Sequence, residues 1–333
     1  MPQPLRKPLK WVGSAKRDFL AFPERVAQRR GAPGAFLMAN GRAASVEPHD
    51  RLAQADFLAV AEATGKAAQA RILAAAPLTL AEIEADFADR IEARREITFD
   101  KTSAALRARE TRKLGALTLE ARNLAVAPGA ETAKALAEAL AGLGIERLPW
   151  SKAQLQLRAR VEFLRRAEGA EWPDMSDTAL AATAGDWLAP FLESARGLSD
   201  VTAETLAAAL DALLPWDLRR RLDMEAPTHF ATPAGSQIAV DYEAEGGPAI
   251  HVRVQELYGL KEHPTLAGGR VKPVFHLLSP AHRPIQTTGD LPRFWAGAWT
   301  DVKKDMKGRY PRHVWPDDPA AAAPTTRAKP RGT

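Results

Sequence analysis

The chain of 333 residues carries a net charge of +5, contains no cysteine, and is 46% hydrophobic. This hydrophobic fraction excludes a wholly disordered chain, and the length suits two or three domains. The lack of cysteine excludes disulfides, zinc–thiolate centres and cysteine nucleophiles, and it is compatible with the reducing cytoplasm in which we expect the protein to reside. No window approaches about 18 uninterrupted apolar residues, so we expect no membrane span and no membrane partner.

Positive charge gathers at both ends of the chain. Residues 1–30 sum to +6 and residues 303–333 to +5, which leaves −6 for the residues between them. Basic segments of this kind attract phosphate groups, and solvated tails that serve only solubility have the same composition. Charge alone therefore leaves nucleic-acid binding and simple solubility open.

In chain order, the first predicted elements are a basic segment and a short helix. Residues 1–18 are basic and contain proline, so we expect them to be poorly packed. Phe19, Phe22 and Val26 are spaced to share one face of a helix over residues 16–30.

Short apolar runs separated by turn residues follow. They predict strands at residues 35–39, 57–61, 70–74, 96–99 and 114–119, and one helix over residues 79–88. Asn40-Gly41 predicts a type I′ hairpin turn, in which both central residues have positive φ. Several short strands with one inserted helix predict a small barrel of the oligonucleotide-binding (OB) type over residues 19–125.

The pattern becomes helical over residues 126–225. Apolar residues recur every three or four positions in successive stripes, which begin near Leu136, Leu157, Leu180 and Leu206. Ser151 and Gln154 form a capping-box pattern before the second stripe. Short links between such helices predict a small helical bundle.

After Pro227 the apolar period changes to two. Residues 238–242 and 250–254 alternate around a Gly-rich turn and predict an antiparallel hairpin, and residues 274–278 predict a further strand. Asp290 then caps a predicted final helix that carries a basic C-terminal end.

These expectations add up to an α+β protein. It would contain the OB-like barrel, the helical domain, a β-rich unit over residues 226–315 closed by the basic helix, and a disordered basic tail over residues 316–333.

Aromatic and basic residues interleave near the C-terminus. Stacking on bases combined with charge contacts to phosphate holds single strands without sequence preference. We therefore take as candidate nucleic-acid contacts Lys303, Lys304, Lys307, Arg309, Arg312, Trp315 and, in a Gly-rich loop, Arg270. Trp295 lies in the apolar stripe of the last helix and is expected in the core, whereas stacking and packing stay open for Trp315. Tryptophans beside or near proline at helix ends are expected to be packing anchors: Trp150, Trp172, Trp187 and Trp216.

Motifs for catalysis are missing from the sequence. Gly65-Lys66 is the nearest approach to a phosphate-binding loop, but Ala67 stands in place of Ser or Thr, and Val60 in place of the first glycine. The histidines show no metal-ligand spacing, and no general acid, general base or nucleophile stands out. We therefore predict no catalytic residue, no metal and no cofactor in this chain.

Several segments together resemble the HrpB family of bacterial ATP-dependent helicases, which are related to the DEAH/RHA helicases. The resemblance starts at residues 21–30 and 37–42, continues through residues 148–160, and runs to the end of the chain in order. Its C-terminal part rests on short motifs at residues 226–229, 254–259, 267–271, 276–280, 308–311 and 315–319.

The resemblance implies the C-terminal accessory part of a helicase. ATP and Mg²⁺ would belong to the RecA-like motor domains of that family, so no ATPase activity is expected from this chain alone. The implied partners are single-stranded RNA or DNA and a separately encoded motor half. A protein-interaction module that docks through the apolar face of the last helix, and a non-functional remnant of a split helicase gene, stay open as alternatives.

Overall fold

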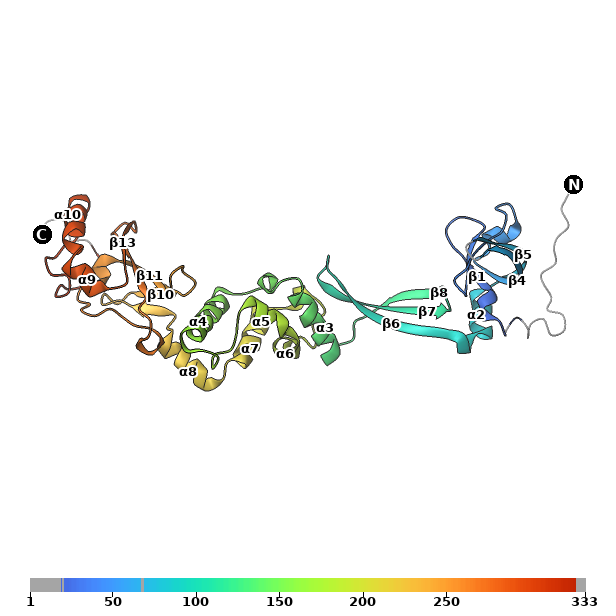
Figure 1. Ribbon diagram of the computed structural model, residues 1–333, viewed down its shortest axis with the longest axis horizontal. Coiled ribbons are helices and arrows are strands. Elements are labelled where there is room, and N and C mark those ends of the chain that lie inside the picture. The colour runs from blue at the N-terminus through green and yellow to red at the C-terminus, as the bar shows by residue number, and fades with distance from the viewer. Residues whose placement is uncertain (1–18, 20, 67–68, 328–333) are drawn as a thin grey trace. The chain divides into compact units, whose positions relative to one another are not determined.

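The computed structural model describes residues 19, 21–66 and 69–327 (Figure 1). The chain divides into two compact units, Met1–Ala127 and Pro128–Thr333. Together they have a mixed α+β composition. In the described parts of both units, no helix is long and apolar enough to cross a membrane.

The first unit contains a closed five-stranded barrel with the strand order β1-β2-β3-β5-β4 (Figure 1). Its neighbouring strands pair antiparallel, except that β3 and β5 run parallel. The strands are β1 (Val26–Arg29), β2 (Ala35–Met38), β3 (Ala43–Ser45), β4 (Phe57–Lys66) and β5 (Gln69–Leu78). Apolar side chains such as Phe36, Leu58 and Val60 form one buried cluster of the barrel.

The predicted helix over residues 16–30 is wrong from Pro23 onward. Residues Pro23–Arg25 form a single 3-10 turn, η1, and the chain then enters strand β1. Val26 and Ala27 are both fully buried, and they belong to two different apolar clusters. Burial on both sides of the chain suits a barrel strand, and this tertiary demand overrides the helical spacing of the apolar residues. Residues 16–18 and 20 lie outside the described residues.

The hairpin predicted at Asn40-Gly41 is confirmed, but its turn is of another kind. Strands β2 and β3 pair from Leu37↔Ala43, and Gly41 has a φ of +82°. Asn40 is not among the described non-glycine residues with positive φ, whereas a type I′ turn needs positive φ at both central positions. The Asn40 side chain instead accepts a hydrogen bond from the backbone N–H of Arg42 at 3.0 Å.

A short helix joins the barrel to a three-stranded antiparallel sheet. Helix α2 (Leu80–Asp86) begins with a capping box between Thr79 and Glu82, which confirms the helix predicted here. The sheet has the order β6-β7-β8, and its strands are β6 (Ile91–Asp100), β7 (Ala105–Leu114) and β8 (Leu117–Leu124). The strand predicted over residues 114–119 is confirmed in part: Leu114 ends β7 and residues 117–119 begin β8, with the β7–β8 turn between them. At that turn Gly115 has positive φ, and a Cβ there would collide with the carbonyl oxygen of Ala39.

The second unit starts with a group of helices. They are α3 (Ala130–Ala141), α4 (Lys152–Glu168), α5 (Asp177–Ala182), α6 (Ala184–Trp187), α7 (Ala203–Leu213) and α8 (Trp216–Glu225). The capping box of Ser151 and Gln154 is confirmed at the start of α4. The third predicted stripe is divided between α5 and α6, which meet at Thr183. Helix α8 was not predicted, because it buries only Leu218 and Leu222 and therefore has a weak apolar period.

A five-stranded sheet follows, with the order β13-β12-β11-β10-β9. The strands are β9 (His229–Ala231), β10 (Gln237–Asp241), β11 (Ala249–Arg253), β12 (Val274–Leu278) and β13 (Pro284–Thr288). The predicted hairpin is confirmed as β10 and β11, and the predicted strand at residues 274–278 is β12, which runs parallel to β11. One face of the sheet is buried through residues such as Ile250, Phe275 and Leu277.

The single final helix predicted after Asp290 is two helices. They are α9 (Leu291–Ala296) and α10 (Trp299–Arg309), and Gly297 between them has non-helical dihedral angles. The Asp290 side chain accepts from the backbone N–H of Arg293 at 3.0 Å, which confirms the predicted cap.

The disorder predicted from Pro316 onward is wrong as far as the described residues extend. The carbonyl of Pro319 accepts from the N–H of Gly259, and the N–H of Thr325 donates to the carbonyl of Gln255. Backbone hydrogen bonds therefore hold this segment against η7 (Val254–Leu257) and the residues that follow it. Residues 328–333 lie outside the described part of the chain.

Candidate nucleic-acid interface

The predicted cationic group on α10 is only partly available. The Nζ of Lys303 lies 2.5 Å from Asp317, and the Nε of Arg309 lies 3.0 Å from Asp305. A hydrogen bond from Lys303 lowers the pKa of Asp317, so this carboxylate keeps its charge opposite the helix. Lys304 and Lys307 are exposed, and in the described chain neither forms a salt bridge. These two lysines are therefore the cations of α10 that can meet phosphate without first breaking an ion pair.

The tryptophans near α10 are mostly structural. Trp295 is 8% and Trp299 1% exposed, which confirms the core position predicted for Trp295. Their indole N–H groups donate to the carbonyls of Leu260 and Pro316. Trp315 is half-buried, packs 6.0 Å from the Trp299 ring, and donates to the carbonyl of Tyr310. These contacts hold the Trp315 side chain in place, and its role in stacking on bases stays a prediction.

The apolar face of the last helix is packed inside the protein. Phe294, Trp299 and Met306 are each less than a tenth exposed. These side chains are covered by the chain itself, and the protein-interaction module stays an untested alternative.

Arg270 lies in an ion cluster instead of beside the α10 lysines. Its guanidinium pairs with Glu168 on α4, whose side chain is only 2% exposed. Glu168 also accepts from the indole N–H of Trp172 at 2.9 Å and from Arg221 at 2.6 Å. Arg270 thus joins the Gly-rich loop to the helices, and its contact with phosphate stays a prediction that would compete with this pairing.

A second glutamate completes the cluster. Burial and a hydrogen bond to Glu168 raise the pKa of Glu225. Burial would also raise the pKa of Glu168, but the hydrogen bonds from Trp172 and Glu225 and the charges of Arg270 and Arg221 hold it below its usual value. The Oε2 of Glu225 is buried without a conventional partner, which a proton shared with Glu168 explains. Within this structural ion cluster the pKa of Glu225 is therefore raised and that of Glu168 is lowered.

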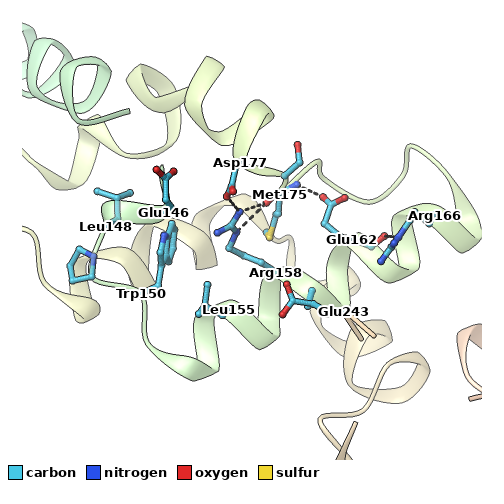
Figure 2. A pocket seen from close by; sticks show the side chains of 13 residues that line it. Glu146, Leu148, Trp150, Leu155, Arg158, Glu162, Arg166, Met175, Asp177 and Glu243 are labelled. Atoms are coloured by element: carbon cyan, nitrogen blue, oxygen red, sulfur yellow. Dashed lines mark hydrogen bonds and ion pairs between the residues drawn. The ribbon is translucent and has the colours of Figure 1, made fainter. Parts of the chain in front are cut away.

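An open pocket of ≈ 570 Å³ lies between α4 and the segment that leads into α5 (Figure 2). The guanidinium of Arg158 lies 4.9 Å from the ring centre of Trp150 and donates to the Met175 carbonyl and to Asp177. The ionisable residues of its lining are the carboxylates of Glu146, Glu162, Asp177 and Glu243 and the guanidinium groups of Arg158 and Arg166. This excess of negative charge disfavours phosphate, and the polar groups around Arg158 already satisfy one another.

Two features of the second unit differ from what the sequence suggested or go beyond it. Trp216, expected to be a packing anchor, is 74% exposed at the start of α8. His251 and His276 stack on neighbouring strands of the sheet, with ring centres 4.4 Å apart and planes 14° apart. Strand alternation is the signal that could have placed both histidines on the face opposite the apolar residues.

In the described residues, no group of three or more His, Asp, Glu or Cys side chains is arranged to hold a metal ion.

Comparison with known proteins shows that the chain is similar to HrpB sequences. Residues 187–319 match the family model "HrpB_C: ATP-dependent helicase C-terminal". Over 312 residues the chain is 38% identical to the protein named ATP-dependent RNA helicase HrpB of Escherichia coli (strain K12). This match covers 93% of the chain and 39% of the relative, so the chain spans about two fifths of that relative's length.

Solved structures agree with the sequence match. The crystal structure of the E. coli DExH-box NTPase HrpB aligns with a TM-score of 0.60 and 37% identity, covering 92% of this chain and 38% of that one. A crystal structure of the Escherichia coli DEAH/RHA helicase HrpB aligns with a TM-score of 0.51 and 32% identity, covering 89% of this chain and 37% of that one.

Proposed function

Because the chain is a C-terminal HrpB-like region, we propose that it is an accessory, nucleic-acid-binding part of an ATP-dependent helicase. The observation that carries the proposal is the similarity over 93% of the chain to a protein named as an RNA helicase. Single-stranded RNA or DNA is the proposed ligand. ATP and Mg²⁺ would be bound by a motor part that contains the nucleotide-binding motifs, and this chain alone would not hydrolyse ATP.

The barrel supports this proposal. Its strand order, with β3 parallel to β5 and β1 closing onto β4, is compatible with a five-stranded barrel of the OB type. Such barrels bind oligonucleotides on one face and in the loops around it. We therefore assign the barrel an OB-like, strand-guiding role.

Among the candidate side chains, Lys304 and Lys307 are the first choice for contact with phosphate. Both are exposed on α10 and free of salt bridges in the described chain. A phosphate contact by Lys303, Arg309 or Arg270 would have to replace an existing carboxylate partner. Trp315 and Arg312 follow α10 directly and complete the candidate surface.

Fluorescence anisotropy of a labelled single-stranded RNA, titrated with the purified chain at several salt concentrations, tests the proposal. Contact with phosphates makes log K fall linearly with log[salt], with a slope of about −0.7 per phosphate for single strands. A single-stranded DNA of the same sequence compares the two ligands. The absence of binding at low salt would contradict the proposal.

Paired substitutions locate the contacts. Lys304→Ala with Lys307→Ala should weaken binding and reduce the steepness of the salt slope by about 1.4, since each lysine accounts for about 0.7. The matched control is Lys152→Ala with Lys261→Ala, which removes two other exposed lysines of the same unit and leaves the net charge equal. An equal loss in both double variants would mean that net charge, and not α10, governs binding.

A further inference from the structure

The five-stranded sheet of the second unit has one buried face, and its other face is exposed at His251, half-buried at His276 and buried at Ala249. Ile250, Val252 and Phe275 point to the buried face and are at most 1% exposed. The residues between them point the other way, and His251 among them is exposed. No side chain of the described chain covers His251 enough to bury it, so this face is open at the middle of the sheet.

Histidines gather on the open face. His251 on β11 is in register with His276 on β12, and their rings stack at 4.4 Å. On β9, His229 is in register with Ala239 of β10 and is also exposed. Continuing the β10–β11 register by one residue from Val240↔Ile250 places Ala239 beside His251. The order across the open face is therefore His229, Ala239, His251, His276.

The small side chain of Ala239 leaves a gap between two of the rings. Neighbouring strands lie about 4.8 Å apart, so the strands of His229 and His251 are separated by roughly 10 Å. A planar ring packs on another at about 3.5–4.0 Å, and a planar base can therefore lie against the free side of the His251 ring above Ala239. Gln237, two residues before Ala239 on β10, lies on the same exposed face and offers hydrogen-bonding groups to the edge of a base.

Cationic groups lie at one end of this face. Arg253 follows His251 by two residues, so it is on the same face, and its Nε pairs with Glu256 at 2.6 Å. Burial and the charges of Arg253 and Arg312 lower the pKa of His313, which places Arg253 and Arg312 near the same imidazole. Asp241 is the strand carboxylate on the open face, at the other end of β10. Arg312, in the chain that follows α10, thus adds positive charge near the C-terminal end of β11. The phosphate backbone of a strand whose base lies on His251 would run past this end.

We propose that the open face of this sheet is a base-stacking platform for single-stranded nucleic acid, with His251 and His276 as the stacking rings. Proteins commonly bind single-stranded RNA by stacking its bases on aromatic side chains of an exposed sheet, and histidine is among the side chains that serve this purpose. This inference rests on the proposed function, and it adds a site where bases, as distinct from phosphates, are held.

Anisotropy with two strands of equal length and charge tests the platform. One probe is a labelled single-stranded RNA, and the other is the same backbone with abasic positions. The unchanged protein should bind the base-containing strand more tightly, and His251→Ala with His276→Ala should weaken that binding roughly 10-fold, within the range known for one stacked base. The same double variant should bind the abasic strand as the unchanged protein does.

Two further variants separate stacking from folding and charge. His251→Phe with His276→Phe keeps flat rings at both positions and should retain most of the preference for bases. His49→Ala removes an exposed histidine in the other unit and should change nothing. Circular dichroism shows whether the double variant is folded. If it is not, His251→Ala alone replaces it in the test, because this variant alters only an exposed side chain.

The outcomes distinguish this inference from the proposed function. Two results would overturn the platform and leave the phosphate-binding function standing. In the first, the unchanged protein binds both strands equally tightly; in the second, the double alanine variant binds the base-containing strand as tightly as the unchanged protein does. Failure of the unchanged protein to bind either strand at low salt would overturn both.

Discussion

At the scale of single residues, the cluster around Glu168 shows how a buried charge is made tolerable. The side chain is 2% exposed, yet it accepts hydrogen bonds from Trp172 and Arg221 and pairs with Arg270. A buried carboxylate without partners would lose its charge, whereas these donors favour the ionised form. Burial and the hydrogen bond to Glu168 raise the pKa of the adjacent Glu225, so it holds a proton to a higher pH than an ordinary glutamate does.

The two glutamates should respond in opposite ways to amide substitution. Glu168→Gln removes the charge that Arg221 and Arg270 require and should destabilise the protein by roughly 1–3 kcal/mol. Glu225→Gln imitates the protonated carboxyl group and should be close to neutral at acidic pH. Because the folded-state pKa of Glu225 is raised, its contribution to stability is present at low pH and is lost as pH rises through that pKa. Thermal melts should therefore show Glu225→Gln gaining stability relative to the unchanged protein as pH rises.

The control for this pair is Glu171→Gln, which alters an exposed partner of Arg221 at the edge of the cluster. Its stability should change little and without a marked pH dependence. Equal losses for the Glu168 and Glu225 variants would argue against the shared proton.

Two tryptophans of similar sequence context should differ sharply in their effect on stability. Trp172 is fully buried, donates to Glu168, and lies under the guanidinium of Arg221 at 5.3 Å. Trp172→Ala should cost about 3–5 kcal/mol, the range for large buried aromatics. Trp216 is 74% exposed, so Trp216→Ala should stay within about 0.5 kcal/mol. Urea denaturation of both variants measures the difference, and a large loss for Trp216→Ala would mean that its side chain is covered in solution.

At the scale of elements, the β6–β7–β8 sheet depends on charged pairs across its strands. Glu110 in the centre of β7 is 8% exposed and lies between Arg95 of β6 at 2.8 Å and Arg122 of β8 at 2.5 Å. Hydrogen bonds from these two arginines lower the pKa of Glu110, so its contribution to stability is present at neutral pH and is lost in acid. Most residues of β6 are exposed, which is why strand pairing here relies on cross-strand contacts more than on a core.

The turn that joins β6 to β7 should keep its carboxylate contacts down to a lower pH than an aspartate with an ordinary pKa would allow. A side-chain hydrogen bond from Arg107, with others from Ser103 and the backbone N–H of Thr102, lowers the pKa of Asp100 to about 2. Stabilisation by this carboxylate is present above its ordinary pKa of about 3.9 and is lost as pH falls through about 2. An NMR titration of the Asp100 carboxyl carbon should show a midpoint near the lower value. A midpoint near the ordinary value would mean that the turn contacts are absent in solution, and Asp89, an exposed aspartate with a longer contact to Arg90, serves as the internal comparison.

At the scale of the whole molecule, the chain is made of two compact units that meet in sequence at Ala127 and Pro128. Strand β8 ends at Leu124 and α3 begins at Ala130, so the connection is short and lies between regular elements. In this connection Ala125, Ala127 and Pro128 are exposed, whereas Val126 is buried. Exposed connections between compact units are preferred sites of proteolysis.

Limited proteolysis with a protease of broad specificity should therefore cut first within residues 125–129. Two protected fragments, one for each unit, should accumulate and be recognised by mass spectrometry. First cuts inside the barrel or inside the five-stranded sheet would contradict this division, and the same digestion in urea gives the pattern expected once the units are unfolded.

Much of this protein was determined by local features of its sequence. The helix after Thr79, the capping box at Ser151 and the alternating strands around residues 238–254 depend on neighbours a few positions away, and all three were predicted. The family resemblance likewise needed only short motifs in order. Closure of the barrel, in contrast, depends on pairing between β1 and β4, whose register joins residues about 30 positions apart, such as Ala27 and Leu58.

Only the tertiary structure decided which side chains are available for binding. Arg270 is occupied because Glu168, 102 residues earlier in the chain, lies beside it. Trp216 is exposed and Trp172 is buried although both stand next to or near proline, because the packing partners of each come from other helices and loops. His251 and His276 come together through the parallel pairing of β11 and β12. Composition and periodicity carry no information on such distant partners, since burial and charge pairing are set by the arrangement of the whole unit.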